Sequence, residues 1–402
     1  MTTLKKPMAD MAELLGFPKN FTDLESQEVK VRYTESTEVQ SGNWFRITFP
    51  KRSMDASLDC RTVRMRFNLT INSTDPDCRL DSDDVRCIFN RVRILSGSTV
   101  LMDLSEASQY FVLDGLIHTS HMDAGYEKFL RGQEPSDKRA TYTNGREYII
   151  HATPHGCLLN NKALLPLERM SNLHLEYYLE TPNKCLFSPA GDANATFTMS
   201  NIEFLCDYIT SPSLSGYYNA NGISFSCQDV SHRYNSILSQ EYLLRMASAH
   251  TSLNSIITTI RPQSQIADTT IDNKLQVFED GTARVKYNLL VNSKLWFEED
   301  QNSVEQSWKD FSEAYPAVVH SLFFDEDYQT SRNVLCNDFS AAPPEFWDTI
   351  ASGVRTARIN SDIVYKIQRV AAPPTPLRAD SYMRADVVVY KDPKYSDLKI
   401  KL

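Results

Sequence analysis

The densest group of potential metal ligands in the sequence is His151-Ala152-Thr153-Pro154-His155-Gly156-Cys157. Its two imidazoles and one thiol could bind a soft metal ion. Pro154 and Gly156, however, are typical of a strand end, where loop histidines are usually solvated. We therefore predict no metal site at His151, His155 and Cys157, and no cofactor elsewhere in the chain.

Two further clusters of ionisable residues have simple structural explanations. Asp81, Asp83 and Asp84 lack the twelve-residue pattern of a calcium-binding loop, so we expect a solvated turn ahead of a strand. His118 and His121 fall at the end of an expected helix, where histidines stabilise the helix dipole. Neither cluster predicts a functional site.

The most basic neighbourhood of the sequence consists of Arg61, Arg64, Arg66, Arg86, Arg91 and Arg93. Binding sites for single-stranded nucleic acid combine such residues with exposed aromatic side chains, but here the aromatic residues fall on the apolar positions. The net charge of −9, from 42 Lys and Arg against 51 Asp and Glu, also argues against a dedicated nucleic-acid binder. We predict a solvated sheet face or a subunit contact, and no sequence-specific nucleic-acid binding.

Sequence motifs of the common enzyme classes are missing from the 402 residues. The phosphate-binding loop, the dinucleotide-binding glycine motif, the nucleophile elbow and the H-E-x-x-H zinc motif are all absent. We therefore predict a structural or binding protein with no catalytic residues.

The elements that would position these residues are mostly β-strands. Between Arg61 and Asn72 the apolar residues Val63, Met65, Phe67, Leu69 and Ile71 alternate with polar ones, which predicts a strand with one face in the core. Leu173–Leu179 alternates in the same way. Only two helices are expected, over Glu106–His118 and after a capping box at Ser303. Many strands, few helices and 10% aromatic residues favour sandwiches or barrels.

The eight cysteines show no paired C-x-x-C spacing, and no apolar signal-peptide region follows the N-terminal Met1–Lys6. We therefore expect reduced, buried thiols in a protein made inside the cell without a secretory signal. A turn-rich stretch at Thr210–Gly222 predicts a domain boundary. The expected division is an N-terminal arm or helix over 1–28, with Met8–Phe17 as the helix candidate, a first domain over 29–215 and a second over 216–402.

Several segments, taken in order, resemble the double jelly-roll major capsid proteins of virophages, polinton-like viruses, adenoviruses and membrane-containing bacteriophages. In the first half these are Trp44–Pro50, Val63–Ile71, Ile88–Ile94 and Leu164–Leu167 followed by Leu173–Leu179. In the second half they are Thr251–Arg261, Val291–Trp296, Ser352–Val354, Asn360–Tyr365 and Val387–Tyr390. The resemblance covers most of the chain.

The resemblance implies an all-β fold of two tandem eight-stranded antiparallel jelly rolls with a few short helices. It also implies a major capsid protein located in the virion, whose homotrimers form pseudo-hexameric capsomers of an icosahedral shell. The implied partners are further copies of the chain, penton and minor capsid proteins, and an internal membrane. Met122–Tyr148 and Asp268–Thr282 are polar stretches between strands, and we expect them to form subunit contacts.

Two functions from other classes stay open at this point. One is a two-jelly-roll enzyme similar to peptide N-glycosidases or copper monooxygenases. The other is a carbohydrate-binding β-sandwich protein with exposed Trp296 or Trp347.

Overall fold

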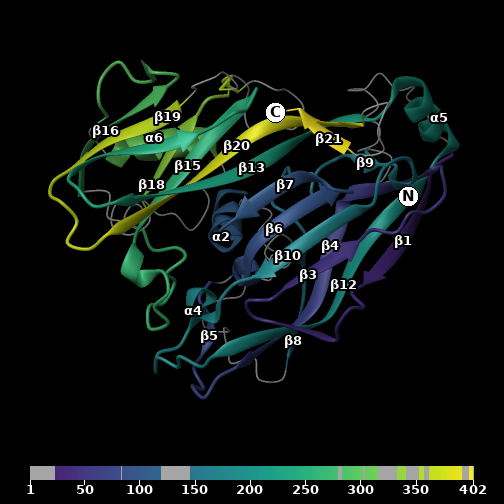
Figure 1. Cartoon of the computed structure of the whole chain (residues 1–402), viewed down its shortest axis with the longest axis horizontal. Helices are drawn as coiled ribbons and strands as arrows, with labels where there is room; N and C mark the ends of the chain where they lie inside the picture. Colours follow the sequence, from purple (N-terminus) through teal and green to yellow (C-terminus); the bar gives the residue numbers. More distant parts are fainter. Residues whose placement is uncertain are drawn as a thin grey trace.

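The computed structural model shows a chain built mainly of antiparallel strands arranged in two β-sandwiches (Figure 1). The structure describes residues 23–82, 84–118, 145–278, 283–301, 304–315, 333–340, 353–356, 362–391 and 398–401.

The first sandwich consists of two sheets. One has the strand order β1 (Glu25–Arg32), β12 (Thr196–Thr210), β4 (Ala56–Asn72) and β8 (Arg146–His151), with the short strands β2 (Glu38–Gln40) on β12 and β9 (Leu164–Leu165) on β4. The facing sheet has the order β3 (Trp44–Thr48), β10 (Leu173–Leu179), β6 (Phe89–Ser96) and β7 (Thr99–Ser105). A separate pair joins β5 (Arg79–Leu80) to β11 (Leu186–Phe187).

The second sandwich has the same plan. Its first sheet has the order β13 (Ser224–Ile237), β20 (Leu377–Lys391), β15 (Leu253–Pro262) and β18 (Val334–Asp338), with β21 (Leu398–Lys401) paired to the end of β20. Its second sheet has the order β14 (Glu241–Ala247), β19 (Asp362–Arg369), β16 (Arg284–Val291) and β17 (Lys294–Leu295).

Both sandwiches connect their eight main strands in the same sequence. When these strands are numbered along each half, one sheet reads first, eighth, third, sixth, and the other reads second, seventh, fourth, fifth. All of these pairs are antiparallel. This is the jelly-roll arrangement of two interlocked Greek keys. The predicted fold of two tandem eight-stranded jelly rolls is therefore confirmed.

The alternating sequence of β4 explains how the first barrel closes. Val63, Met65, Phe67 and Leu69 are completely buried, whereas the polar residues that alternate with them are partly exposed. Leu175 of β10 faces them from the opposite sheet and is also completely buried. Burying one face of each sheet in this way is worth about 25 cal/mol for each Å² of apolar surface. A shift of one residue would turn the whole apolar set towards water.

Helices are few, as predicted. α2 (Ala107–His118) and α6 (Val304–Ala314) match the two expected helices, and Phe311 and Tyr315 at the end of α6 are buried. The remaining α-helices of the described residues are α4 (Pro182–Cys185) and α5 (Pro212–Asn221). The stretch expected to be a turn-rich linker is thus largely helical, because the Ser211 side chain caps the N–H of Leu214 and Pro212 occupies the first turn.

The connection between the barrels consists of α5, since β12 ends at Thr210 and β13 begins at Ser224. A division at residue 215 stays a prediction, because it falls inside this helix. The boundary at residue 28 is corrected: Glu25–Arg32 pairs along its whole length with β12, so the first barrel begins before residue 29. The predicted helix over Met8–Phe17 lies outside the described residues.

Candidate functional site

The histidines and the cysteine of the segment His151–Cys157, where we predict no metal site, differ in their exposure. His151 and Cys157 are buried, whereas His155 between them is exposed. Burial raises the pKa of the Cys157 thiol well above its usual value, so the thiolate that a metal requires is disfavoured. Among the described residues there is no group of three or more His, Cys, Asp or Glu side chains that could hold a metal ion. Within the residues that the structure describes, no helix is long and apolar enough to cross a membrane.

The acidic cluster is not a solvated turn, and that prediction is wrong for both described residues. Asp81 is completely buried, and its carboxylate accepts the backbone N–H groups of Lys274 and Leu275 at 3.1 and 3.0 Å. The Lys274 ammonium lies 3.4 Å away and donates to the carbonyl of Leu186 at 2.7 Å. Asp84 is also buried and caps the 3₁₀ helix Val85–Ile88. Asp83 lies outside the described residues.

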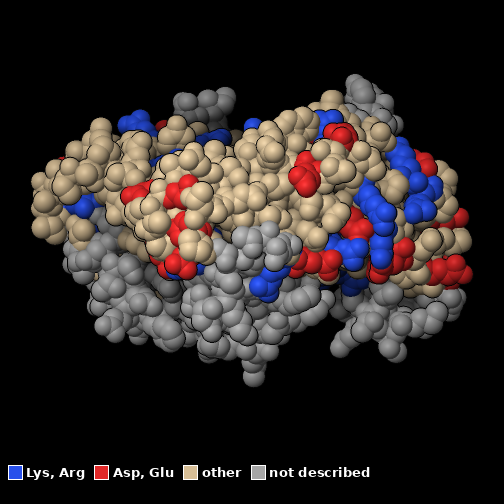
Figure 2. Space-filling model, turned by 90° about the horizontal axis from the view of Figure 1, so that it is seen from below, with Lys and Arg blue, Asp and Glu red and all other residues tan. Residues whose placement is uncertain are grey.

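The arginine neighbourhood is balanced by acids from the same chain. Arg86 is completely buried between Asp84 and Asp114, so its placement on a solvated face is corrected. The other arginines are partly buried, and four of them have carboxylate partners: Arg61 pairs with Asp59, Arg66 with Glu203, Arg91 with Asp103, and Arg93 with both Asp103 and Glu176. The surface in Figure 2 likewise shows Lys and Arg side by side with Asp and Glu rather than one continuous basic area.

Of the two tryptophans considered for carbohydrate stacking, Trp296 has 42% of its surface exposed. Its ring stands edge-on to Phe339 with the centroids 4.9 Å apart, so part of it packs within the protein. Trp347 and His121 lie outside the described residues, as does the side chain of His118.

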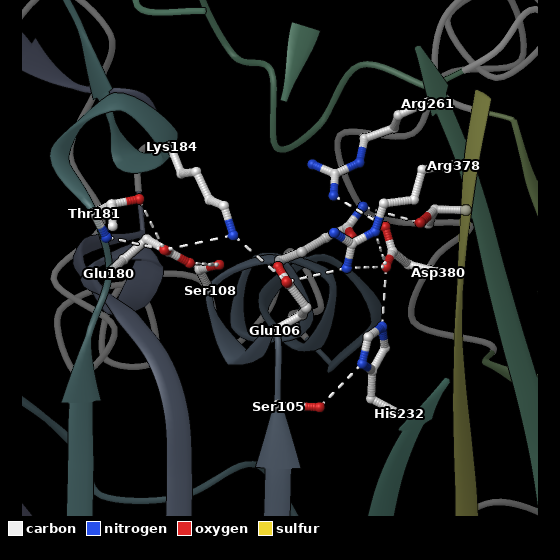
Figure 3. A network of polar contacts seen from close by, with 12 residues as sticks. Ser105, Glu106, Ser108, Glu180, Thr181, Lys184, His232, Arg261, Arg378 and Asp380 are labelled. Atoms are coloured by element: carbon white, nitrogen blue, oxygen red, sulfur yellow. Dashed lines mark hydrogen bonds and ion pairs between the residues drawn. The ribbon is translucent and has the colours of Figure 1, made fainter. Parts of the chain in front are cut away.

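One network of buried charges lies where the two barrels meet (Figure 3). Asp380 on β20 of the second barrel is the centre of this network. It accepts from His232 at 3.0 Å and pairs with Arg261 at 3.1 Å and Arg378 at 2.8 Å. Burial opposes the ionisation of Asp380, but the hydrogen bond from His232 and the two guanidinium groups outweigh it and lower its pKa.

The first barrel contributes residues to this network from the turn between β7 and α2. Glu106 adopts a left-handed backbone conformation with φ of 49° and pairs with Arg378 of the second barrel at 3.0 Å. On its other side Lys184 lies 3.5 Å from Glu106 and 3.7 Å from Glu180. Ser105, the last residue of β7, lies 3.1 Å from the second nitrogen of His232. The two barrels thus share one chain of ion pairs and hydrogen bonds.

Helix α2 adds apolar and polar contacts to the same interface. The ring of Tyr110 lies 5.0 Å from that of Tyr382 on β20, and the Tyr382 hydroxyl donates to the Glu106 carbonyl at 3.0 Å. Gln109 donates to Thr259 on β15 at 2.9 Å. Buried residues of both barrels belong to one apolar cluster here.

Gly156 marks a further point where the barrels meet closely. Gln228 at the start of the second barrel donates its backbone N–H to the Gly156 carbonyl at 2.9 Å. Gly156 has a φ of 78°, and a Cβ atom there would lie 2.7 Å from the Gln228 side chain. Arg384 on β20 donates to Gln228 and, at 3.3 Å, to the carbonyl of His155. The segment considered as a metal site therefore serves as a barrel contact.

Sequence reasoning identified none of the network residues around Asp380, although it named its helix and several of its strands. The ion pairs of Asp380 with Arg261 and of Glu106 with Arg378 join segments over a hundred residues apart, so they leave no local spacing pattern. A weak signal exists: Arg261 follows Ile260, Arg378 lies between Leu377 and Ala379, and Asp380 follows Ala379.

No protein-family model and no curated protein sequence matches the chain. Among solved structures, PBCV-1 VP54, fitted into a cryo-EM reconstruction of the virophage Sputnik, superposes with a TM-score of 0.66 and 11% identity over 95% of this chain and 98% of its own. The Faustovirus major capsid protein gives 0.65 and 8% over 93% and 92%. A chain of the Sputnik virophage gives 0.58 and 9% over 94% and 88%. The chain therefore has the double jelly-roll fold of these virus structures.

Proposed function

We propose that the chain is a major capsid protein whose trimers tile an icosahedral virus shell. The observation that carries this proposal is the identical strand order of the two barrels, combined with a likeness to virus capsid structures that extends over nearly the whole chain. The same comparisons give no support to the two-jelly-roll enzymes considered as alternatives.

Two similar barrels in one chain suit a particular kind of tile. Three copies around a threefold axis place six barrels in a ring, so a trimer fits a near-hexagonal lattice. The contact in such a ring is heterologous, because one surface of each subunit meets a different surface of the next. The buried network around Asp380 supports this role, since its Glu106–Arg378 ion pair and its Ser105–His232 contact join the two barrels of one subunit.

The subunit contact should bury more than about 2,000 Å², as in other obligate oligomers. One segment expected to contribute is partly used inside the subunit: within Asp268–Thr282, Lys274, Leu275 and Phe278 are buried against the rest of the same chain. That part cannot also form the subunit contact. The other segment, Met122–Tyr148, lies mostly outside the described residues, and its role stays a prediction.

The proposed location is the virion, and the proposed partners are further copies of the chain, penton and minor capsid proteins, and an internal membrane. The balanced surface charge supports a shell protein without sequence-specific nucleic-acid binding.

The test is the mass and shape of the purified protein. Light scattering coupled to size exclusion should give a trimer or a larger species, and negative-stain microscopy should show hexagonal particles. Dilution should destabilise the protein, because dissociation exposes the interface to water. A stable monomer at micromolar concentration, with no shells or sheets at any salt concentration or pH, would reject the capsid role.

A further inference from the structure

Three residues of the junction network have the side chains and the order of contacts of a serine hydrolase triad (Figure 3). The Ser105 hydroxyl oxygen lies 3.1 Å from Nδ1 of His232, and Nε2 of His232 lies 3.0 Å from Oδ1 of Asp380. Ser105 belongs to the first barrel, whereas His232 on β13 and Asp380 on β20 belong to the second. Such a triad is recognised by its geometry and not by chain order, since it recurs on unrelated folds.

The charges around Asp380 determine which nitrogen of His232 carries the proton. Burial opposes the ionisation of Asp380, but the hydrogen bond from His232 and the guanidinium groups of Arg261 and Arg378 lower its pKa. An ionised carboxylate can only accept hydrogen bonds, so Nε2 of His232 is the protonated nitrogen. In the neutral imidazole Nδ1 then has a free lone pair, 3.1 Å from the Ser105 hydroxyl. His232 is thus arranged to accept the proton of Ser105.

The imidazole of His232 is also held in a fixed orientation. Its ring lies 5.0 Å from the ring of Tyr382 and 6.5 Å from the nearly parallel ring of Tyr234, measured between centroids. Only 5% of the surface of His232 is exposed. A base that is already oriented needs no further ordering when the proton moves, which lowers the barrier.

The serine is accessible from a groove of about 1,200 Å³ at the junction of the two barrels. Ser105 and His232 both line this groove, and Ser105 is partly exposed. The volume is sufficient for a small molecule, since binding sites for such ligands typically measure about 300–1,000 Å³. Val100, which is 38% exposed, adds apolar surface to the same lining. A small acyl group can therefore reach the Ser105 hydroxyl.

The backbone around Ser105 also suits a nucleophile. Ser105 ends β7, Glu106 makes the turn with φ of 49°, and α2 begins at Ala107. A serine on a sharp strand-to-helix turn is likewise the arrangement of the nucleophile elbow in α/β hydrolases. The first turn of the twelve-residue helix α2 carries N–H groups without an acceptor inside the helix, and with them the positive end of the helix dipole. This end lies two residues from Ser105 and favours negative charge on a reacting carbonyl oxygen.

We propose that Ser105 is a nucleophile that cleaves small carboxylic esters in the groove, with His232 as general base and Asp380 as the residue that positions His232. His232 takes the Ser105 proton while Oγ bonds to the ester carbonyl carbon, and the alcohol leaves with that proton as its C–O bond breaks. Water then gives a proton to His232 and attacks the acyl group. The carboxylic acid is released, and Ser105 regains its proton from His232. Turnover is slow, because Arg261 and Arg378 share the charge of Asp380 and weaken its support of the imidazolium.

The experiment treats the purified full-length protein with a fluorescent fluorophosphonate, which reacts with activated serines, and locates the label by mass spectrometry. We expect the label on Ser105. Ser105→Ala should remove it, and His232→Gln should slow labelling by about 100-fold or more, as expected for loss of a general base. Hydrolysis of p-nitrophenyl acetate should decrease in the same two variants.

The matched control is Ser231→Ala, since Ser231 lines the same groove and also lies beside a histidine. Its hydroxyl is 3.4 Å from Nε2 of His250, but Nδ1 of His250 is buried without a hydrogen-bond partner, so no carboxylate positions that ring. The control should therefore be labelled at the rate of the native protein. Label on Ser231 in place of Ser105 would overturn the proposal.

The positioning role of Asp380 is tested by two variants. Asp380→Asn should slow labelling, and Asp380→Glu, which retains a carboxylate, should restore part of the rate. Melting temperatures show which variants are folded; where one is not, the labelled residue of the native protein and the His232→Gln rate decide. No label on Ser105 in the native protein, or equal labelling rates in the native protein and His232→Gln, would reject the proposed activity.

Discussion

Lys274→Met should strongly destabilise the protein, because it leaves Asp81 buried without its cation. Both side chains are almost completely inaccessible, and the change removes the ammonium 3.4 Å from the Asp81 carboxylate while leaving the backbone N–H groups of residues 274 and 275. Removing one partner of a buried ion pair is destabilising by about 3–5 kcal/mol. With an m value of about 2–3 kcal/mol per M, the urea midpoint should fall by about 1–2.5 M. Tryptophan fluorescence at a fixed protein concentration provides the measurement.

The matched control is Lys286→Met, which makes the same change in an accessible ion pair. Lys286 lies 3.1 Å from Asp300, closer than Lys274 lies to Asp81, but both side chains are more than a third exposed. Such pairs contribute about 0–1 kcal/mol. If the distance between the charges governed stability, Lys286→Met would lower the free energy of unfolding more than Lys274→Met. If burial governs it, Lys274→Met should show by far the larger loss.

The decrease in the free energy of unfolding caused by Lys274→Met should also depend on pH. Burial already raises the pKa of Asp81 in the folded protein, and removing the lysine raises it further. A carboxyl group whose pKa is higher in the folded than in the unfolded state gains stability as the pH falls. The deficit should therefore be smaller at pH 5 than at pH 8. Equal midpoint shifts for the two lysine variants, or a deficit that does not change with pH, would refute this reasoning.

Three further predictions concern the core, the thiols and the barrel contact. Phe67→Asp should abolish soluble expression, since the site is completely buried, whereas the neighbouring Asn68→Ala on the polar face should preserve it; equal yields would contradict the strand orientation. Alkylation of the denatured, unreduced protein followed by mass spectrometry should label eight cysteines, because all are buried free thiols; stoichiometric disulfides would be a contrary result. Gly156→Ala should lower the melting temperature more than Gly42→Ala. Both glycines have φ of 78°, but only the first would bring a Cβ atom within 2.7 Å of Gln228. Similar losses would show that the barrels do not meet closely there.

The strands could be predicted from the sequence where one face is buried and the other is wet. β4 and β10 have this pattern, and their predicted core residues Phe67 and Leu175 are completely buried. The prediction was incomplete for β15 and β20, which are buried on both faces and include polar residues that contact the other barrel. Thr259, Asp380 and Arg384 interrupt the apolar pattern there, because each has a buried partner distant in the sequence.

The ionisable clusters were harder to interpret than the strands. Asp81 was expected in a solvated turn and Arg86 on a solvated sheet face or subunit contact, but their burial depends on Lys274 and Asp114, which lie far away in the sequence. The partner of Asp81 comes from a loop of the second barrel, nearly two hundred residues later. Local rules place such residues on the surface because lone charges are rarely buried. Only the packed tertiary structure supplies the compensating charge.

The position of β20 has a consequence for biosynthesis. This strand is the last long one to be made, yet it lies inside its sheet between β13 and β15 and carries Asp380. By contrast, the first barrel has all of its strands once Thr210 has left the ribosome. A nascent chain can thus complete one half early, while the second half lacks an inner strand until translation has passed Lys391. Prematurely terminated chains would lack both the inner strand and the central carboxylate of the junction, so the second barrel of a truncated copy could not close.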